Sequence, residues 1–399
     1  MKKICGMLLA VLMLLTLMPA TELEAAQYYI PGTIIVSPLG SDYNSGTELA
    51  PVKTIQQAVN MAGPGTTIYL RTGTYDGGVN INKSGTKDKY ITITNYRGEV
   101  AKVTGNYTTN LSYGLAVIGQ SYIKISGLQI GGFTAQHAVG ILVNAGSHNV
   151  ILENNVITNI VTSQPTSSAG NANAIMLYGQ GKNSAAAITN VQINRNIING
   201  NANGYGENIA IYGNCDTITV TSNQVFNNGC TGVGVQGNYG YAPGVLDMPR
   251  NVTLTGNLIY SNGNKGVGVN IDGAYGVTMN NNTCNDQYYG VLIGGSRSNQ
   301  YTDMNNMTHN ISLVGNSING NKRGGVFIGG ETEDVSTAVV WNVVLRSNSI
   351  TDNGGFCVSL AKCSNVTVTD NTLTPAAGAT TYATPLGNDW ATGLSLQVR

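Results

Sequence analysis

The chain has 399 residues, and its 20 Lys and Arg are balanced by 20 Asp and Glu, so the formal net charge is zero. Charged residues make up 10% of the sequence and hydrophobic residues 42%, which excludes a disordered chain, because disorder needs high net charge and little hydrophobicity. A neutral chain has no basic surplus to displace counterions, so nucleic acid is excluded as the main partner. A large folded protein remains, rich in Asn and Gly and polar but mostly uncharged at its surface.

The N-terminus has the pattern of a secretion signal. Two lysines are followed by an apolar run over residues 4–18 and then by a stretch of small and polar residues. This order is typical of a signal peptide, so we expect residues 1–26 to be removed near Ala25 or Ala26 and the mature protein to be secreted or held at the cell surface. The apolar run is too short to span a membrane comfortably, and no later stretch approaches a membrane span.

The mature chain contains an odd number of cysteines. We expect the protein to be a monomer, so at least one thiol stays unpaired. Their spacing does not match that of zinc ligands, and a chain of this length needs no disulfides to be stable. We expect most of them to be structural and Cys284 to be a buried, small apolar side chain. The five are Cys215, Cys230, Cys284, Cys357 and Cys363.

A repeat organises the rest of the chain. Each copy ends in an Asn that is preceded by two aliphatic residues separated by a spacer, as in VILENN and VTLTGN. A second motif of alternating residues, such as GILV or GVGV, comes before it. Alternation with a period of two predicts short, half-buried strands. Strands that recur every 23 to 41 residues or so predict a right-handed parallel β-helix, an all-β solenoid. The recurrent Asn would then stack as an internal ladder, at Asn155, Asn196, Asn223, Asn257, Asn282, Asn316, Asn348 and Asn371.

The N-terminal part of the mature chain departs from this repeat. Residues 51–62 place Val52, Ile55, Val59 and Ala62 on one helical face, which predicts an amphipathic helix that caps the solenoid. Strands are expected at 67–75 and 90–96. The predicted organisation is a single β-helix domain over residues 27–399, made of a cap with the first strand (27–75), coils (76–371) and a C-terminal extension (372–399).

A resemblance to a known family is carried by the first quarter of the mature chain. It reads IIVSPLGSDYNSGTELAPVKTIQQAVNMAGPGTTIYLRTGTY and continues as INKSGTKDKYITITNYRGE. This opening is similar to that of secreted β-helix polysaccharide lyases, most closely polysaccharide lyase family nine, the pectate-lyase family. The resemblance implies the β-helix fold, calcium held by clustered aspartates and a lysine base. The aspartate cluster is not found in this sequence, so calcium is implied by the resemblance alone.

Stacking of the coils predicts rows of outward-facing residues along the second motif. When the repeats are aligned by their similar motifs, Ala210, Gly234 and Gly268 occupy equivalent outward positions in three consecutive coils. These small residues would form a smooth floor on the sheet, which would suit a polymer-binding groove; alternatively, they merely suit a flat exposed sheet. Polar rows border this floor, and long loops follow the same strands, where insertions often build a binding wall. The bordering rows are Tyr178, Tyr212, Gln236 and Asn270; Asn214, Asn238, Asp272 and Glu331; and, on the entering side, Glu207, Thr231, Lys265 and Tyr289.

Tyrosine supplies 21 of the aromatic residues, against 4 Phe and 2 Trp. Rings with neighbouring amides can bind sugars, although strand propensity alone also places tyrosines in sheets. Those in or beside the central coils are Tyr205, Tyr212, Tyr239, Tyr241, Tyr275, Tyr288 and Tyr289. The predicted substrate-binding residues are Tyr178, Tyr212, Gln236, Asn238, Tyr239, Tyr241, Asn270, Arg250 and Arg297.

Three functions fit the sequence. A lyase acting on a uronate such as pectate needs a base for the C5 proton and cations for the carboxylate; Lys265 is the base candidate, and the cation candidates are Lys182, Arg250, Arg297, Lys322 and Arg323. A glycoside hydrolase needs two carboxyl groups, for which Glu207, Asp247 and Asp272 are the candidates. The third function is a non-catalytic carbohydrate-binding or cell-surface protein. The lyase is the leading prediction, with polysaccharide as the partner.

Overall fold

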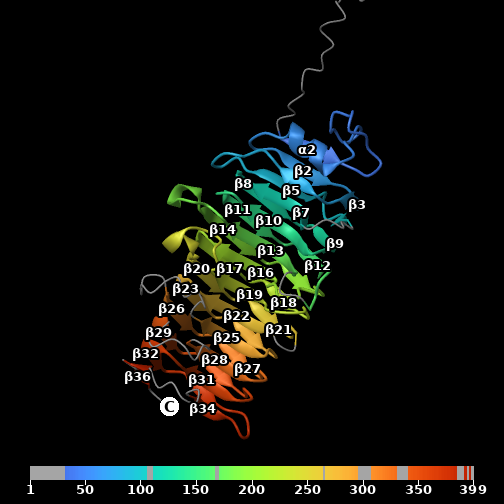
Figure 1. The fold of residues 1–399 in the computed structure, drawn as a ribbon. Coiled ribbons are helices and arrows are strands. Elements are labelled where there is room, and N and C mark those ends of the chain that lie inside the picture. Colours follow the sequence, from blue (N-terminus) through green and yellow to red (C-terminus); the bar gives the residue numbers. More distant parts are fainter. Residues whose placement is uncertain are drawn as a thin grey trace, which may run out of the picture.

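The computed structural model describes residues 32–105, 111–166, 170–263, 266–294, 307–329, 340–383, 391–392 and 395–396. These residues form three long sheets in which neighbouring strands are parallel and come from successive coils of the chain. Figure 1 shows the coils stacked along one axis, from the blue N-terminal end to the red C-terminal end. The fold is therefore the predicted parallel β-helix. The predicted signal peptide lies outside the described residues.

Each complete coil between residues 67 and 383 contributes one strand to each sheet, and sheet A has further strands at both ends; we name the sheets A, B and C. Sheet A consists of β1 (Thr33–Val36), β2 (Thr67–Leu70), β5 (Ile91–Asn95), β8 (Ser121–Ser126), β11 (His148–Glu153), β14 (Ile188–Asn194), β17 (Cys215–Thr221), β20 (Arg250–Thr255), β23 (Tyr275–Asn280), β26 (Thr308–Val314), β29 (Val340–Arg346), β32 (Cys363–Thr369), β35 (Ala391–Thr392) and β36 (Ser395–Leu396). Sheet B consists of β3 (Gly73–Asp76), β6 (Ala101–Thr104), β9 (Gln129–Ala135), β12 (Val156–Thr162), β15 (Ile197–Asn199), β18 (Gln224–Phe226), β21 (Leu258–Tyr260), β24 (Thr283–Asn285), β27 (Ser317–Asn319), β30 (Ser349–Thr351) and β33 (Thr372–Thr374). Sheet C consists of β4 (Val79–Ile81), β7 (Leu111–Ile118), β10 (His137–Asn144), β13 (Asn171–Gly179), β16 (Ile209–Gly213), β19 (Val233–Gln236), β22 (Val267–Asp272), β25 (Tyr289–Gly294), β28 (Gly324–Ile328), β31 (Phe356–Leu360) and β34 (Thr380–Ala383).

A short helix, α2 (Ile55–Met61), lies at the N-terminal end of the solenoid (Figure 1). Its buried face is Ile55, Ala58 and Val59, which join the same core as the first strands, so the predicted cap helix is present. It begins later than predicted because Thr54 caps it, accepting a hydrogen bond from the backbone N–H of Gln57. The single strand expected over 67–75 is two strands, β2 and β3, which lie in different sheets.

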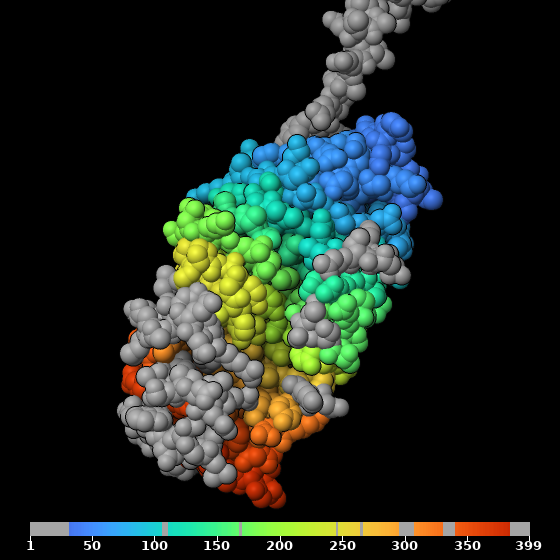
Figure 2. Space-filling view, viewed as in Figure 1, coloured from blue at the N-terminus to red at the C-terminus, as the bar shows by residue number. Residues whose placement is uncertain are grey.

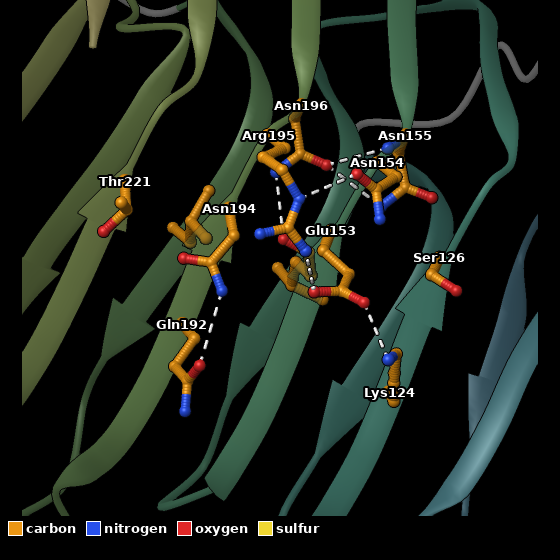
Figure 3. Close-up of polar contacts among 12 residues, drawn as sticks. Lys124, Ser126, Glu153, Asn154, Asn155, Gln192, Asn194, Arg195, Asn196 and Thr221 are labelled. Carbon is orange, nitrogen blue, oxygen red and sulfur yellow. Dashed lines mark hydrogen bonds and ion pairs between the residues drawn. The ribbon is translucent and has the colours of Figure 1, made fainter. Parts of the chain in front are cut away.

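The predicted Asn ladder is present at the turn from sheet A to sheet B. The side-chain oxygen of each Asn accepts from the backbone N–H and from the amide of the Asn one coil before; Asn196, for example, accepts both from Asn155 (3.0 and 3.1 Å). Figure 3 shows this first rung beside Asn154 and Arg195, whose left-handed φ of 55° and 51° makes the sharp turn. All eight predicted residues are buried and bonded, as buried amides must be.

A second ladder, which the sequence analysis missed, lies at the turn from sheet B to sheet C. Its members follow the first ladder at a constant distance of five residues, a signal that was present in the sequence. Gln287 occupies one rung and breaks the run of identical letters. The rungs are Asn201, Asn228, Asn262, Gln287, Asn321 and Asn353.

The second ladder corrects the predicted register of sheet C. Val233 pairs with Val269, and Gly234 pairs with Asn270, not with Gly268. The turn after Asn262 is two residues longer than the turn after Asn228, while the ladder holds these two residues level. The floor row therefore runs Ala210, Gly234, Asn270, and the polar row runs Tyr212, Gln236, Asp272. Lys265 lies outside the described residues, and Val267 takes its place beside Thr231.

Burial accounts for the cysteines. Cys284 is fully buried between Ile259 and Ile318 of sheet B, as predicted, and burial raises the pKa of its thiol to about 12. All five cysteines of the described residues are free thiols. Within the described part of the chain, no helix has the length and hydrophobicity needed to cross a membrane.

We predict that Asn282→Ala lowers the free energy of unfolding by about 3 kcal/mol, because it leaves the buried N–H of Asn257 without its acceptor and removes the bond to the carbonyl of Leu254. The control is Asn280→Ala, at a half-exposed position at the end of β23, two residues before Asn282. Denaturant unfolding of both variants measures the difference. Equal stabilities would contradict a ladder that stabilises the fold.

Candidate functional site

The outer face of sheet C carries a carboxylate where a smooth floor was expected. Glu207 precedes β16 and lies across the next coil, and its side chain is almost wholly buried, at 6% exposed. A Cβ placed on Gly234 would come within 2.5 Å of Cγ of Glu207. Glycine at position 234 is therefore required for Glu207 to occupy this position, and the two residues form one unit.

Both oxygens of Glu207 are hydrogen-bonded. The Tyr212 hydroxyl donates to Oε2, and Gln236 Nε2 donates to Oε1 at 2.7 Å. Burial raises the pKa of Glu207, and these two bonds oppose the rise. Burial, together with the negative charge of Glu207, also raises the pKa of Tyr212 well above its usual value. Both groups are thus held toward their protonated forms.

The loop between β19 and β20 folds back over this face and is organised by Asp247, at the end of a 3₁₀ helix (Gly244–Asp247). Its oxygens accept from the backbone N–H groups of Gly240 (2.6 Å), Tyr241 (3.1 Å) and Ala242 (3.1 Å). Asp247 is fully buried, so its place is inside the loop, where it positions neighbours rather than faces a substrate. In Figure 2 the yellow atoms of this region project from one side of the body.

Four tyrosines meet where this loop reaches sheet C. Tyr241 stacks on Tyr212 with ring centroids 5.1 Å apart, and Tyr178 meets Tyr241 edge-on at 5.5 Å. Tyr239 lies 5.9 Å from Tyr241, and its hydroxyl donates to Oδ2 of Asp272. Burial, and then the charge of Asp272, raises the pKa of Tyr239 far above its usual value. We call this group the tyrosine–carboxylate cluster: Tyr178, Glu207, Tyr212, Gln236, Tyr239, Tyr241 and Asp272.

Most of the predicted site residues thus lie together in this cluster, but Arg250 does not. Arg250 lies on sheet A, where Nε donates to Asp216 at 3.0 Å and Nη1 to Asn214 at 3.1 Å. Arg297 lies outside the described residues, as do Lys265 and Glu331. The predicted Asn238 is buried beside the loop, and Asn270 is half-buried in the floor row, two residues before Asp272.

The described residues do not provide the calcium site that the resemblance implies. Among them, no group of three or more His, Cys, Asp or Glu side chains lies close enough together to hold a metal ion. Asp247 accepts three backbone N–H groups, and Glu207 accepts a hydroxyl and an amide. We derive no step through calcium, which stays an expectation of the resemblance.

The other predicted tyrosines belong to two separate groups. Tyr288 and Tyr289 pack against Phe327 and Phe356 in later coils of sheet C. Tyr275 begins an aromatic stack on sheet A, in which His309 lies 5.0 Å from Tyr275 and 4.7 Å from Trp341, centroid to centroid. The sequence analysis missed this stack, although each member precedes a ladder Asn by seven residues.

Comparison with known proteins places this architecture in a family. A model described as "Pel9A-like, right handed beta helix region" matches residues 34–299, and a model of the right-handed β-helix region matches residues 245–385. The uncharacterised protein YwoF of Bacillus subtilis is 32% identical over 364 residues, covering 86% of this chain and 74% of YwoF. The chain belongs to the Pel9A-like right-handed β-helix family. The predicted handedness and the predicted family resemblance are thus confirmed.

Other similarities of this Pel9A-like protein are partial or extend to the fold alone. Pectate lyase PEL9 of Emericella nidulans is 46% identical over 74 residues, 18% of each chain. The A-module of the Azotobacter vinelandii mannuronan C-5 epimerase AlgE4 superimposes with a TM-score of 0.58 at 16% identity, over 86% of this chain and 92% of that one. A rhamnogalacturonan lyase superimposes with a TM-score of 0.50 at 11% identity, over 91% and 87%.

We predict that Glu207→Gln makes stability less dependent on pH. A raised pKa in the folded state means that wild-type protein has its full stability at low pH and loses part of it as pH rises through the pKa of buried Glu207. Glutamine does not ionise, so this loss disappears. Thermal unfolding between about pH 4 and pH 8 measures the effect, with Asp76→Asn, at an exposed position, as the control. An unchanged pH profile in Glu207→Gln would contradict the assigned burial.

We also predict that Asp247→Ala loosens the loop without unfolding the solenoid, because three backbone N–H groups lose their acceptor while the ladders stay intact. Hydrogen exchange at residues 240–242 should speed up by about tenfold or more, as expected for the loss of hydrogen bonds worth over 1 kcal/mol. Exchange at the ladder residues, measured in the same sample, should not change. Protection of residues 240–242 at the wild-type level would show that Asp247 does not hold the loop.

Proposed function

We propose that the protein is a secreted enzyme that cleaves a uronate-containing polysaccharide, of which pectate is one example, by β-elimination. The proposal rests on the tyrosine–carboxylate cluster, which gathers aromatic rings, protonated hydroxyls and carboxyl groups on one outward face of a rigid solenoid. Membership of a family with a pectate-lyase-like fold supports it, as does the short match to a curated pectate lyase. The chain of the substrate would lie across sheet C.

The half-exposed members of the cluster are suited to hold sugar rings. Tyr239 is 49% exposed, and Tyr178 and Tyr241 are partly exposed beside it. An aromatic face packs against the C–H groups of a sugar, and neighbouring amides such as that of Asn270 pair with its hydroxyls. Because Asp247 and the ring stack hold the loop in place, this face is formed before the substrate arrives.

In the elimination, the C5–H and C4–O4 bonds break, a C4–C5 double bond forms, a base takes the C5 proton and an acid protonates O4. Tyr239 is our candidate for the acid. The phenol is protonated at neutral pH and half exposed, so its hydroxyl is available to a substrate as a donor and not as a base. Asp272 accepts the hydroxyl hydrogen bond and so orients Tyr239. Lys265 stays our candidate for the base.

A second candidate function, glycoside hydrolysis, is favoured by one observation. Glu207 has a raised pKa, as an acid catalyst needs, and Asp272 supplies another carboxyl group; Gln236 lies between the two, bonded to Glu207 and paired in register with Asp272. The burial of Glu207 argues against this role, since a general acid must reach the glycosidic oxygen. A face that binds polysaccharide without cleaving it is the third possibility that the experiment must separate.

A polysaccharide panel read by two assays separates these functions. Ultraviolet absorbance of an unsaturated uronate marks elimination, while new reducing ends without that absorbance mark hydrolysis. Neither signal, over neutral and acidic polymers, would leave only the non-catalytic function.

We predict that Tyr239→Phe lowers kcat of the elimination by about 10²-fold or more, because it removes the acid but keeps the ring. KM should change little, since the stacking surface stays. The control is Tyr260→Phe, whose ring stacks on Phe226 on sheet B. Full activity of Tyr239→Phe would remove Tyr239 as the acid.

A further inference from the structure

We infer that the uronates bound on sheet C are uncharged, as methyl esters, rather than free carboxylates. This inference rests on the proposed function and concerns the chemical form of the substrate at the same face. It is carried by the charges, the apolar side chains and the ion pairs of the described residues.

The charge of the face is the first observation. Two outward rows run along sheet C from β7 to β22, beginning at Ala116 and Ile118, and a third runs from Tyr113 to Asn173, with Glu207 after it in the next coil. At the described positions of these rows the charged side chains are Glu207 and Asp272, and none is Lys or Arg. A polyuronate carries one negative charge per sugar, so these described rows offer it no cation, and an ionised Asp272 would repel it. A methyl-esterified chain lacks that charge and keeps the same hydroxyl groups, from which carboxylates accept hydrogen bonds.

The apolar character of the neighbouring coils is the second observation. Next to the cluster, Tyr178 and Met176 are partly exposed and pack with Ile118 against buried Leu142 and Val139, all on the outward face of sheet C. A carboxylate placed against such a patch would lose water without gaining a partner. A methyl ester adds apolar surface there and carries no charge to desolvate.

The ion pairs of sheet A are the third observation. Lys124 and Arg195 both bind Glu153, at 2.7 and 2.8 Å, as Figure 3 shows. Arg250 likewise binds Asp216 on that sheet. These cations are neutralised by carboxylates of sheet A, so their charge is not directed to the chain that would lie on sheet C.

The chemistry of elimination agrees with these observations. Removing the C5 proton beside a carboxylate puts a second negative charge on the same group, whereas beside an ester it makes a single enolate oxyanion. The amide of Asn270 can donate a hydrogen bond to this oxygen, while the Tyr239 hydroxyl serves O4. The rest of the step is unchanged: the base holds the C5 proton, O4 gains a proton, and the C4–C5 double bond forms.

The test uses one polyuronate preparation, highly methyl-esterified pectin, and portions of it de-esterified to different extents at matched chain length. With the full-length protein we expect kcat/KM for the unsaturated product to be at least about tenfold higher on the esterified polymer, and binding of the two polymers to follow the same order. Preference for the free acid in cleavage or in binding would overturn the inference while leaving elimination intact. If neither polymer yields product, the proposed function fails, and the binding order alone decides the inference.

A charge variant sharpens the test. Met176→Lys places a cation on the apolar patch and should lower the ester-to-acid ratio of kcat/KM by about threefold or more, while Met176→Gln, which is polar but uncharged and matches Met in length, should not. Circular dichroism of both variants checks the fold. An ester-to-acid ratio that responds equally to Lys and Gln would contradict a preference set by charge.

Discussion

A buried amide must be hydrogen-bonded, and in this protein its partner is an amide of the next coil. The two ladders, beginning at Asn155 and Asn201, satisfy this requirement along the solenoid. In the first ladder each rung joins a backbone N–H and a side-chain amide to the following coil, and in the second ladder each rung joins one or both. The coils therefore cannot slide past one another without leaving buried polar groups unpaired. The position of every outward residue therefore depends on these inward ones.

The candidate site shows the same requirement on the outer face. Glu207 is buried because Gly234 leaves space for it, and it is satisfied by Tyr212 and Gln236 from its own coil and the next. Asp247 satisfies three backbone N–H groups in the loop above. Two carboxylates that sequence analysis places among catalytic candidates thus hold the tyrosines in position, and Tyr239 with Asp272 is the pair most open to a substrate.

Polarity links this arrangement to the proposed chemistry. The described face of sheet C combines aromatic rings, apolar side chains and acids, while Lys124, Arg195 and Arg250 are paired with carboxylates on sheet A. A face of this kind favours a neutral sugar chain, and raised pKa values make its hydroxyls donors rather than bases. Family membership shows a pectate-lyase-like scaffold, and the proposed preference for an uncharged uronate rests on the local residues.

The sequence by itself determined the solenoid, its cap helix and the first ladder, because one coil is one repeat and the inward Asn recurs in every copy. It also placed Tyr212, Gln236 and Asp272 on the outward side, since the period of two settles which face a side chain takes. Only the tertiary structure decided that Asn270 pairs with Gly234. One turn is longer by two residues, and the identical GVGV motifs of the two strands hide this shift in the sequence. It also decided that Glu207 covers Gly234 and that Tyr241 returns to stack on Tyr212, since contacts between coils depend on turn geometry, which no repeat encodes.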